Sequence, residues 1–342
     1  MTGVARTVLG DVPVEALGLT LIHEHLHMDC SSLAAAHGYV PDPDPGEFTV
    51  HSAAECRWNP GAHPDNYRFT EHDPVLEDLV DYADLGGRTV VDATPLDLGR
   101  DPAALARLSR ESGLHVVMGT GYYLEATHRA FLAPGTQESA TYDVILAEDG
   151  GEGIRPGMIG EIGTSDPPTE GELRVVRGAA RAAQETGLPL SIHLHPWSDT
   201  ATRVLDVVGE TGLPLRRVLL NHLSTAIRDE DRVRALLATG VRLSFDLCGF
   251  DHSLLGPGRY PPSDDEAAQL VARLVNDGFA GQVMMSQDVG VRTRLRRYGG
   301  WGYGHLIRHL VPLLRSHGVD DEGITELFVD APASFLALEA GR

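Results

Sequence analysis

The chain has 342 residues, of which 42% are hydrophobic and 23% are charged, as in ordinary soluble globular proteins. Its 28 Lys and Arg residues are all arginines, which excludes chemistry that needs lysine: a P-loop, a Schiff base, or a carboxylated lysine between two metals. The net charge of −21 disfavours nucleic acids and anionic membranes as partners, and agrees with plain solubility or with attraction of metal cations.

The start of the chain and its cysteines predict a cytoplasmic protein. Residues 1–21 lack the basic start and apolar run of a signal peptide. No stretch approaches the length of apolar residues that a transmembrane helix needs, so we expect no membrane span. Cys30, Cys56 and Cys248 are widely spaced and odd in number, which indicates no disulfide framework and a reducing compartment.

Short apolar runs alternate with amphipathic stretches along the chain. We predict strands at residues 19–25, 89–94, 115–120, 158–163, 190–195, 218–223, 241–247 and 282–288. We predict helices at residues 74–85, 102–112, 169–186, 200–210, 229–238 and 264–277. Alternation of this kind implies parallel βαβ units, and eight of them predict an α/β fold, the closed (β/α)8 TIM barrel. No linker divides the chain, so residues 1–342 are expected to form a single domain.

A polar segment at residues 38–73, rich in Pro, His and Asp, lies between the first two predicted strands. It is long for a loop without structure of its own. We interpret it as a loop insertion that covers the barrel mouth; a mobile insertion without that role is the alternative.

Polar side chains gather at the predicted strand ends, where the active sites of TIM barrels lie. His23 and His25 end the first strand and, two residues apart, point to the same face. Other predicted strands carry Glu161, His193, His195, His222, Asp246 and Asp288 at or near their ends. Because so many buried polar groups need a common partner, and imidazole with carboxylate suits divalent ions, this pattern predicts two metal ions.

Ordered motifs extend this pattern over nearly the whole chain, from RTVLG at residues 6–10 to DAP at residues 330–332. Between them come TLIHEH (20–25), GTGYY (119–123), GMIGEIG (157–163), SIH (191–193), NHL (221–223), FD (245–246), SQD (286–288) and YGGWGY (298–303). Together they resemble the phosphotriesterase-related branch of the amidohydrolase superfamily. The DAP segment departs from the usual Asn-Pro of that family, a change that we expect to affect packing only.

The resemblance implies a binuclear metal-dependent hydrolase in which a metal-bridging hydroxide attacks the substrate. It implies that His23 and His25 hold the more buried metal together with Asp288, which also takes a proton during catalysis. It implies that His193 and His222 hold the more exposed metal. We expect zinc in both positions, with manganese, cobalt or iron as alternatives.

The family bridges its two metals with a carboxylated lysine in one part and a glutamate in another. This sequence has Glu161 at that position, which places it in the glutamate branch. A glutamate offers two oxygens without needing carbon dioxide. A mononuclear, deaminase-type site has no bridging acid, so Glu161 argues against it.

Six further residues are candidate substrate contacts. Tyr122 and Tyr123 follow the third strand at the barrel mouth, where they could pack a substrate or only the loop, and His195 has no ligand role in the family. Arg292, Arg294 and Arg297 lie in the densest positive segment of the chain, directly after Asp288. They could bind an anionic substrate, or belong to a solvated loop or a surface salt-bridge cluster.

We therefore expect an enzyme that hydrolyses a lactone, a carboxylic ester or an amide. Its substrate is expected to be a small molecule that could be anionic. Acyl-homoserine lactones are disfavoured, because Leu247 follows Asp246 where that branch carries an arginine. Phosphotriester hydrolysis is one alternative, and a non-catalytic small-molecule-binding barrel is another. By analogy with other barrels, the chain could form a homodimer.

Overall fold

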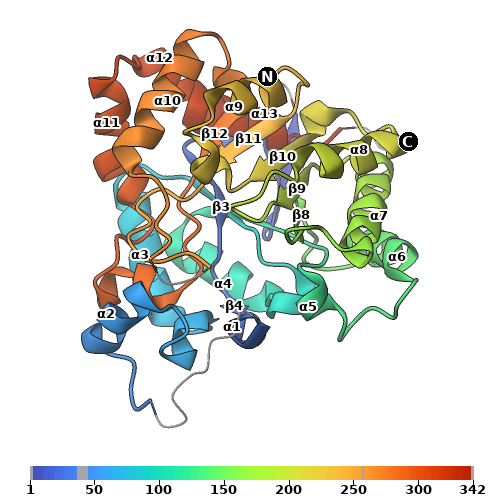
Figure 1. The fold of residues 1–342 in the computed structure, drawn as a ribbon, viewed down its shortest axis with the longest axis horizontal. Helices are drawn as coiled ribbons and strands as arrows, with labels where there is room; N and C mark the ends of the chain where they lie inside the picture. Colours follow the sequence, from blue (N-terminus) through green and yellow to red (C-terminus); the bar gives the residue numbers. More distant parts are fainter. Residues whose placement is uncertain (1–2, 37–44, 256–257, 340–342) are drawn as a thin grey trace.

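The computed structural model describes residues 3–36, 45–255 and 258–339 of the chain. Eight strands stand at its centre with helices around them (Figure 1). Each strand lies within its predicted run. They are β3 (Thr20–Glu24), β6 (Thr89–Asp92), β7 (His115–Met118), β8 (Ile159–Gly163), β9 (Leu190–His193), β10 (Val218–Asn221), β11 (Arg242–Phe245) and β12 (Val283–Met285).

The eight strands close into a barrel. Strands β3, β6 and β7 pair in parallel, and so do β8, β9, β10, β11 and β12. Two seams join these sheets: the N–H of Gly157 donates to the carbonyl of Met118 at 2.9 Å, and that of Asp288 donates to the carbonyl of His23 at 3.2 Å. The α/β fold is therefore the predicted TIM barrel.

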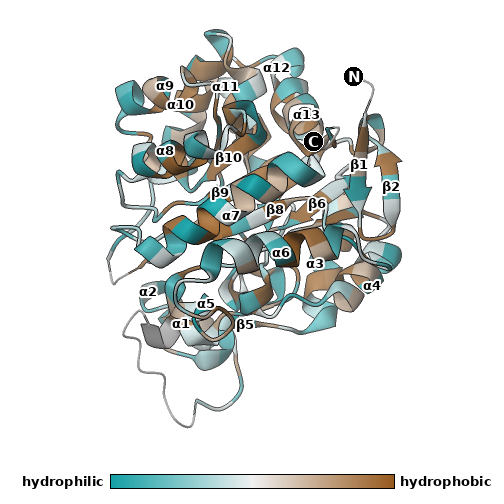
Figure 2. Ribbon diagram, turned by 90° about the vertical axis from the view of Figure 1, so that its right-hand side faces the viewer, coloured by the Kyte–Doolittle hydropathy of each residue, from teal (hydrophilic) through white to brown (hydrophobic). Residues whose placement is uncertain are grey.

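The predicted helices are all present, with ends within two residues of expectation. They are α3 (His72–Asp84), α4 (Pro102–Ser112), α7 (Glu170–Thr186), α8 (Ala201–Thr211), α9 (Glu230–Leu237) and α10 (Asp264–Asn276). Thr169 and Ser263 begin α7 and α10 with reciprocal capping hydrogen bonds. Figure 2 shows hydrophilic residues along outer helices such as α7 and hydrophobic residues on the strands behind them.

The structure adds elements that the alternating pattern does not predict. An antiparallel hairpin of β1 and β2 precedes the barrel, and two π-helical turns (Leu306–Leu310 and Glu326–Asp330) interrupt the C-terminal helices. Contacts with neighbouring elements, such as that of the hairpin with β7, stabilise them more than a long periodic pattern does. They are β1 (Val4–Thr7), β2 (Gly10–Pro13), α1 (Ser31–Ala36), α5 (Glu125–His128), α6 (Gln137–Asp149), α11 (Val311–Ser316), α12 (Asp321–Thr325) and α13 (Ala331–Leu336).

The polar segment at residues 38–73 contains secondary structure. Its described part holds α2 (Val50–Trp58), a 3-10 turn and β5 (Arg68–Phe69), which pairs antiparallel with β4 (Met28–Asp29). Residues 38–44 lie outside the described residues. Among the described residues, no helix combines the length and apolarity that crossing a bilayer requires.

One hydrophobic cluster inside the barrel positions the site. It joins strand residues such as Ile22 and Leu219 to the N-terminal hairpin and to Phe335 of α13. Because apolar side chains fill the barrel on this side, the polar side chains of the strands gather at the carboxyl ends. β3 and β8 each have a shift of register there, of the kind that re-aims side chains beside active sites.

Candidate metal centre

Six side chains from the ends of five strands meet at the carboxyl end of the barrel. β3 brings His23 and, one residue beyond its end, His25, whose rings lie 5.6 Å apart. The others are Glu161 of β8, His193 at the end of β9, His222 directly after β10, and Asp288 after β12. The structure thus brings together all six residues that were expected to bind metal.

Glu161 lies between the histidines. Its Oε1 is 3.5 Å from Nε2 of His25, whereas its Oε2 is 3.3 Å from Nδ1 of His193 and 3.4 Å from Nε2 of His222. Oε2 also lies 3.6 Å from Nε2 of His23. The two oxygens therefore face different histidines, which is the arrangement that a carboxylate bridging two ions requires.

Asp288 completes the more buried end of this group. Its Oδ1 is 3.2 Å from Nε2 of His25 and 3.7 Å from Nε2 of His23. Two sets of side chains have ligand atoms within 4.8 Å of one another: His23 with His25 and Asp288, and His23 with Glu161 and His222. Both sets contain the nitrogen and oxygen ligands that zinc and similar ions take.

Unpartnered polar atoms show that these residues fit metal ions. Both ring nitrogens of His23 and the Oε2 of Glu161 are buried without a hydrogen bond among the described residues. Such orphaned atoms are rare in folded proteins, because each costs desolvation energy without a compensating bond. Bound divalent ions would satisfy them.

The charged groups of the site shift one another's pKa values. Burial lowers the pKa of His23, but Glu161, Asp246 and Asp288 outweigh it and raise this pKa to about 9. Burial would raise the pKa of the Glu161 carboxyl, yet the surrounding histidines hold it well below its usual range. Burial and the neighbouring His222 lower the pKa of His193 to about 4. The site therefore favours ionised carboxylates and stabilises positive charge between them.

Neighbouring residues orient the histidine rings. Asp246 lies 3.0 Å from Nδ1 of His222 and accepts the backbone N–H of the same residue. The hydroxyl of Thr94 lies 2.9 Å from Nδ1 of His25. With Nδ1 engaged in each ring, Nε2 remains for a metal, as is usual for metal-binding histidines.

Glu24 holds the end of β12 rather than a histidine ring. Its carboxylate accepts the hydroxyl of Ser286 at 2.7 Å and the backbone N–H groups of Gln287 and Val289 at 2.9 and 2.8 Å. Asp288, between these donors, has a φ of 52°, in the left-handed region that costs a non-glycine residue energy. Glu24 therefore stabilises the backbone that presents Asp288.

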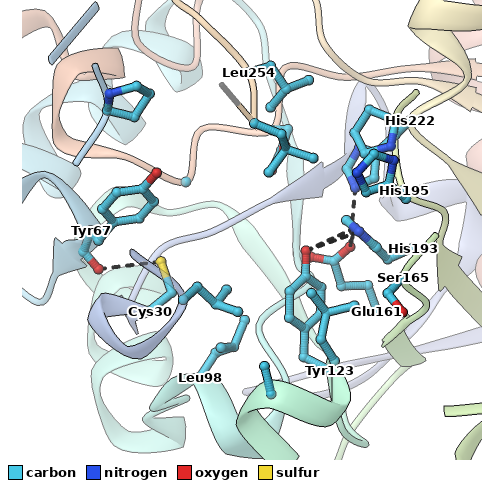
Figure 3. Close-up of a pocket in the computed structure, with 18 of the residues that line it drawn as sticks. Cys30, Tyr67, Leu98, Tyr123, Glu161, Ser165, His193, His195, His222 and Leu254 are labelled. Atoms are coloured by element: carbon cyan, nitrogen blue, oxygen red, sulfur yellow. Dashed lines mark hydrogen bonds and ion pairs between the residues drawn. The ribbon is translucent and has the colours of Figure 1, made fainter. Parts of the chain in front are cut away.

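A pocket of about 880 Å³ opens above this centre. His25, Glu161, His193, His222 and Asp288 form part of its wall. Figure 3 shows Glu161 and Tyr123 on one side of the open space and Cys30, Tyr67 and Leu98 on the other. The cavity is within the size range of small-molecule sites, roughly 300–1,000 Å³.

The expected substrate contacts divide into two groups. Tyr123 and His195 line the pocket, and the Tyr123 hydroxyl lies 3.0 Å from Nδ1 of His193. Asp97 fixes Tyr123 by accepting its backbone N–H at 2.9 Å. Tyr122 is buried and does not line the pocket, and its ring packs near Phe131 instead.

The three expected arginines do not line the pocket either. Arg292 lies over the Phe48 ring and pairs with Glu71 at 3.3 Å. Arg294 is buried and donates to backbone carbonyls, and Arg297 pairs with Glu77 at the surface. In a chain of net charge −21, local acids and carbonyls engage these cations before a substrate can.

Other pocket residues were not expected from the sequence. The loop between β11 and α10 contributes Phe250, His252 and Leu254, and the segment around β4 contributes Met28 and Cys30. They are mostly apolar and follow no regular period, so only the position of a loop at the carboxyl end of a strand could have indicated them.

Comparisons with known proteins agree with this geometry. A model described as the phosphotriesterase family matches residues 3–336. The chain belongs to the phosphotriesterase family. It is 31% identical to N-acetyltaurine hydrolase of Danio rerio and 30% identical to that of Homo sapiens, each over 99% of both chains.

Solved structures of the phosphotriesterase family share the fold. A resiniferatoxin-binding protein from Rhodobacter sphaeroides is 37% identical and superposes with a TM-score of 0.90, covering 99% of this chain and 96% of that one. The phosphotriesterase homology protein from Escherichia coli, solved with phosphate in its active site, is 26% identical with a TM-score of 0.76, covering 94% and 99%. The chain is a metal-dependent hydrolase of this family.

Proposed function

We propose that the chain hydrolyses an amide bond of a small N-acyl substrate, using two divalent ions, zinc first among the candidates. The convergence of six candidate metal-binding side chains beneath a large pocket carries this proposal. Similarity to N-acetyltaurine hydrolases over 99% of the chain favours an amide over an ester or lactone.

In this proposal His23, His25 and Asp288 would hold one ion and His193 and His222 the other, as the family resemblance implies, and Glu161 would supply a ligand oxygen to each. When bound, the ions supply a water acidic enough to lose its proton near neutral pH and an electrophile for the carbonyl oxygen.

Asp288 is the proton carrier in this mechanism. Its side chain is 19% exposed, so it reaches the pocket while staying 3.2 Å from His25. It accepts the proton of the attacking water and passes it to the leaving amine, which must be protonated to depart. The Tyr123 hydroxyl, next to His193, is placed to donate to the carbonyl oxygen as negative charge develops there.

The test combines metal analysis with a substrate panel. We expect about two equivalents of metal and the highest kcat/KM for N-acyl amides among amides, esters, lactones and paraoxon. Asp288→Asn should keep metal and lose roughly 10²–10⁴-fold in kcat. Asp143→Asn, on the exposed face of α6, is the matched control and should be unchanged. Absence of both metal and turnover would favour a non-catalytic binding barrel, and paraoxon as the best substrate would favour a phosphotriesterase.

We also propose that residues 38–73 cover the substrate. Asn59, Pro60 and Tyr67 of this segment line the pocket, which supports the proposal. A bound product should slow backbone hydrogen exchange in α2, and unchanged exchange would contradict a covering role. Since the three arginines after Asp288 are engaged elsewhere, they take no part in the proposed substrate contacts.

A further inference from the structure

The two sides of the pocket differ in polarity. Loops after β7 and β8 bring a polar side, with Glu125, Arg129, Ser165, Asp166 and Thr169. The segment around β4, the loop after β6 and the loop after β11 bring an apolar side. We call this side the apolar chamber: Met28, Cys30, Leu33, Leu98 and Leu254.

Most of the apolar chamber lies across open space from the metal centre, whereas Met28 packs beside Gly290 near His25. Figure 3 shows Cys30 and Leu98 on the wall opposite His193, and Leu254 above the space between. The scissile bond must lie near Glu161 and Asp288, so a group attached to the substrate carbonyl can extend from there into the chamber.

The five side chains of the chamber offer a ligand almost no hydrogen bonds, and Asn59 and Tyr67 are polar residues that line the pocket near them. The Cys30 thiol donates to the carbonyl of Tyr67 at 3.4 Å, and burial raises its pKa, so it stays neutral. Met28, Leu33 and Leu98 are only 4%, 6% and 2% exposed, and they present hydrocarbon apart from the weakly polar thioether of Met28. Water in such a space makes few hydrogen bonds. A hydrocarbon chain that displaces this water is stabilised by the hydrophobic effect.

The size of the cavity also favours an acyl group longer than acetyl. An acetyl group supplies one methyl beyond the carbonyl, whereas the pocket measures about 880 Å³. An N-acetyl substrate would therefore leave the chamber without an occupant. On the polar side, Arg129 is the one arginine that lines the pocket among the described residues, and its Nε donates to the backbone carbonyl of Glu125 at 3.2 Å.

We infer that the preferred substrate is an N-acyl amide with a medium-length, unbranched acyl chain that occupies the apolar chamber, and with a polar or anionic amine portion that faces Arg129. The inference rests on the proposed amide hydrolysis and adds the substrate class.

The test is a chain-length series on the purified holoenzyme: N-acetyl, N-butanoyl, N-hexanoyl and N-octanoyl taurine. Burying one CH₂ is worth about 0.8 kcal/mol, which is about fourfold in kcat/KM, so each two-carbon step should raise kcat/KM roughly fifteenfold. A flat or falling series, with N-acetyltaurine hydrolysed, would overturn the inference and leave the proposed function intact.

Substitutions in the apolar chamber test whether this part of the pocket causes the preference for longer acyl chains. Leu254→Trp should lower the octanoyl-to-acetyl ratio of kcat/KM at least tenfold by filling the chamber, and Leu98→Phe should lower it from the opposite wall. Leu9→Trp, an exposed position outside the pocket, is the matched control and should leave the ratio unchanged. An unchanged ratio in both chamber variants would overturn the assignment of the chamber.

A binding measurement separates the two proposals. If no amide is hydrolysed, the proposed function fails, and calorimetry with the same amides still tests the chamber. Tighter binding of N-octanoyl than of N-acetyl taurine would support the chamber, and equal dissociation constants would overturn it.

Discussion

Replacing Glu24 by glutamine tests whether the backbone at the end of β12 controls catalysis. The Glu24 carboxylate accepts three hydrogen bonds, with Oε1 taking those of Ser286 and Gln287 and Oε2 taking that of Val289. A glutamine has one acceptor oxygen, so its NH₂ group must face at least one of these donors. If the amide oxygen keeps the Oε1 position, the NH₂ group faces the N–H of Val289, and these two buried donors lack partners. At about 1–3 kcal/mol each, we expect a loss of stability on the order of 3 kcal/mol.

The same change should reduce activity, because Asp288 lies between the two backbone donors. A displacement of about 1 Å at a reacting group can cost about 10²-fold. We therefore expect Glu24→Gln to lower kcat by about that factor with bound metal retained, measured by steady-state kinetics, urea unfolding and metal analysis. Glu170→Gln, on the exposed start of α7, is the control. Activity within threefold of the parent and stability within about 0.5 kcal/mol, the usual range for surface changes, would refute the reasoning.

Three further outcomes are expected. Burial raises the pKa of Asp78 from 3.8 to about 6, so the parent loses stability as pH rises from about 4 to 6, where the unfolded chain is ionised and the folded chain is still protonated. The Asp78→Asn variant has no carboxyl group there and should not show this loss. Urea unfolding should find the variant more stable than the parent by roughly 3 kcal/mol at pH 7 and about equally stable at pH 4. Parallel pH profiles of stability for the two proteins would contradict this expectation. Thr94→Val removes the partner of His25 and should weaken metal affinity about 10–100-fold in competition with a chelator, while Thr136→Val, at an exposed helix start, should not. Chelation should abolish activity and lower Tm, and zinc without bicarbonate should restore both; a bicarbonate requirement would count against Glu161 as the bridge.

The sequence predicted the barrel because strand and helix signals repeat along it. Parallel strands buried on both faces read as short apolar runs, and glycine turns such as Gly113 and Gly187, with φ of 74° and 73°, mark the helix ends. The hairpin of β1 and β2 and the π-helical turns escaped prediction, since contacts with the barrel rather than local pattern hold them in place.

The metal-binding residues were predictable for a similar reason. Strand ends converge in a closed barrel, so His23 and His222 meet although they lie 199 positions apart in the sequence. The register shift in β3 was not predictable, because a local irregularity leaves no period in the sequence. Substrate contacts were harder still: Arg292 and Arg294 follow Asp288 in the chain, yet partners from distant segments, including Glu71 and Gly249, engage them.

The missing lysine and the position of Glu161 belong to one argument. A chain without lysine cannot form a carboxylated lysine bridge, so in the proposed centre Glu161 of β8 would take that place. Glutamate is shorter than carboxylated lysine, and the register shift of β8 between Ile159 and Ile162 falls where this acid is placed. Its oxygens lie 3.5 Å from His25 and 3.3 Å from His193, on the two sides of the centre. The local irregularity of β8 and the position of Glu161 therefore coincide, and from this position the side chain contacts histidines on both sides of the proposed centre.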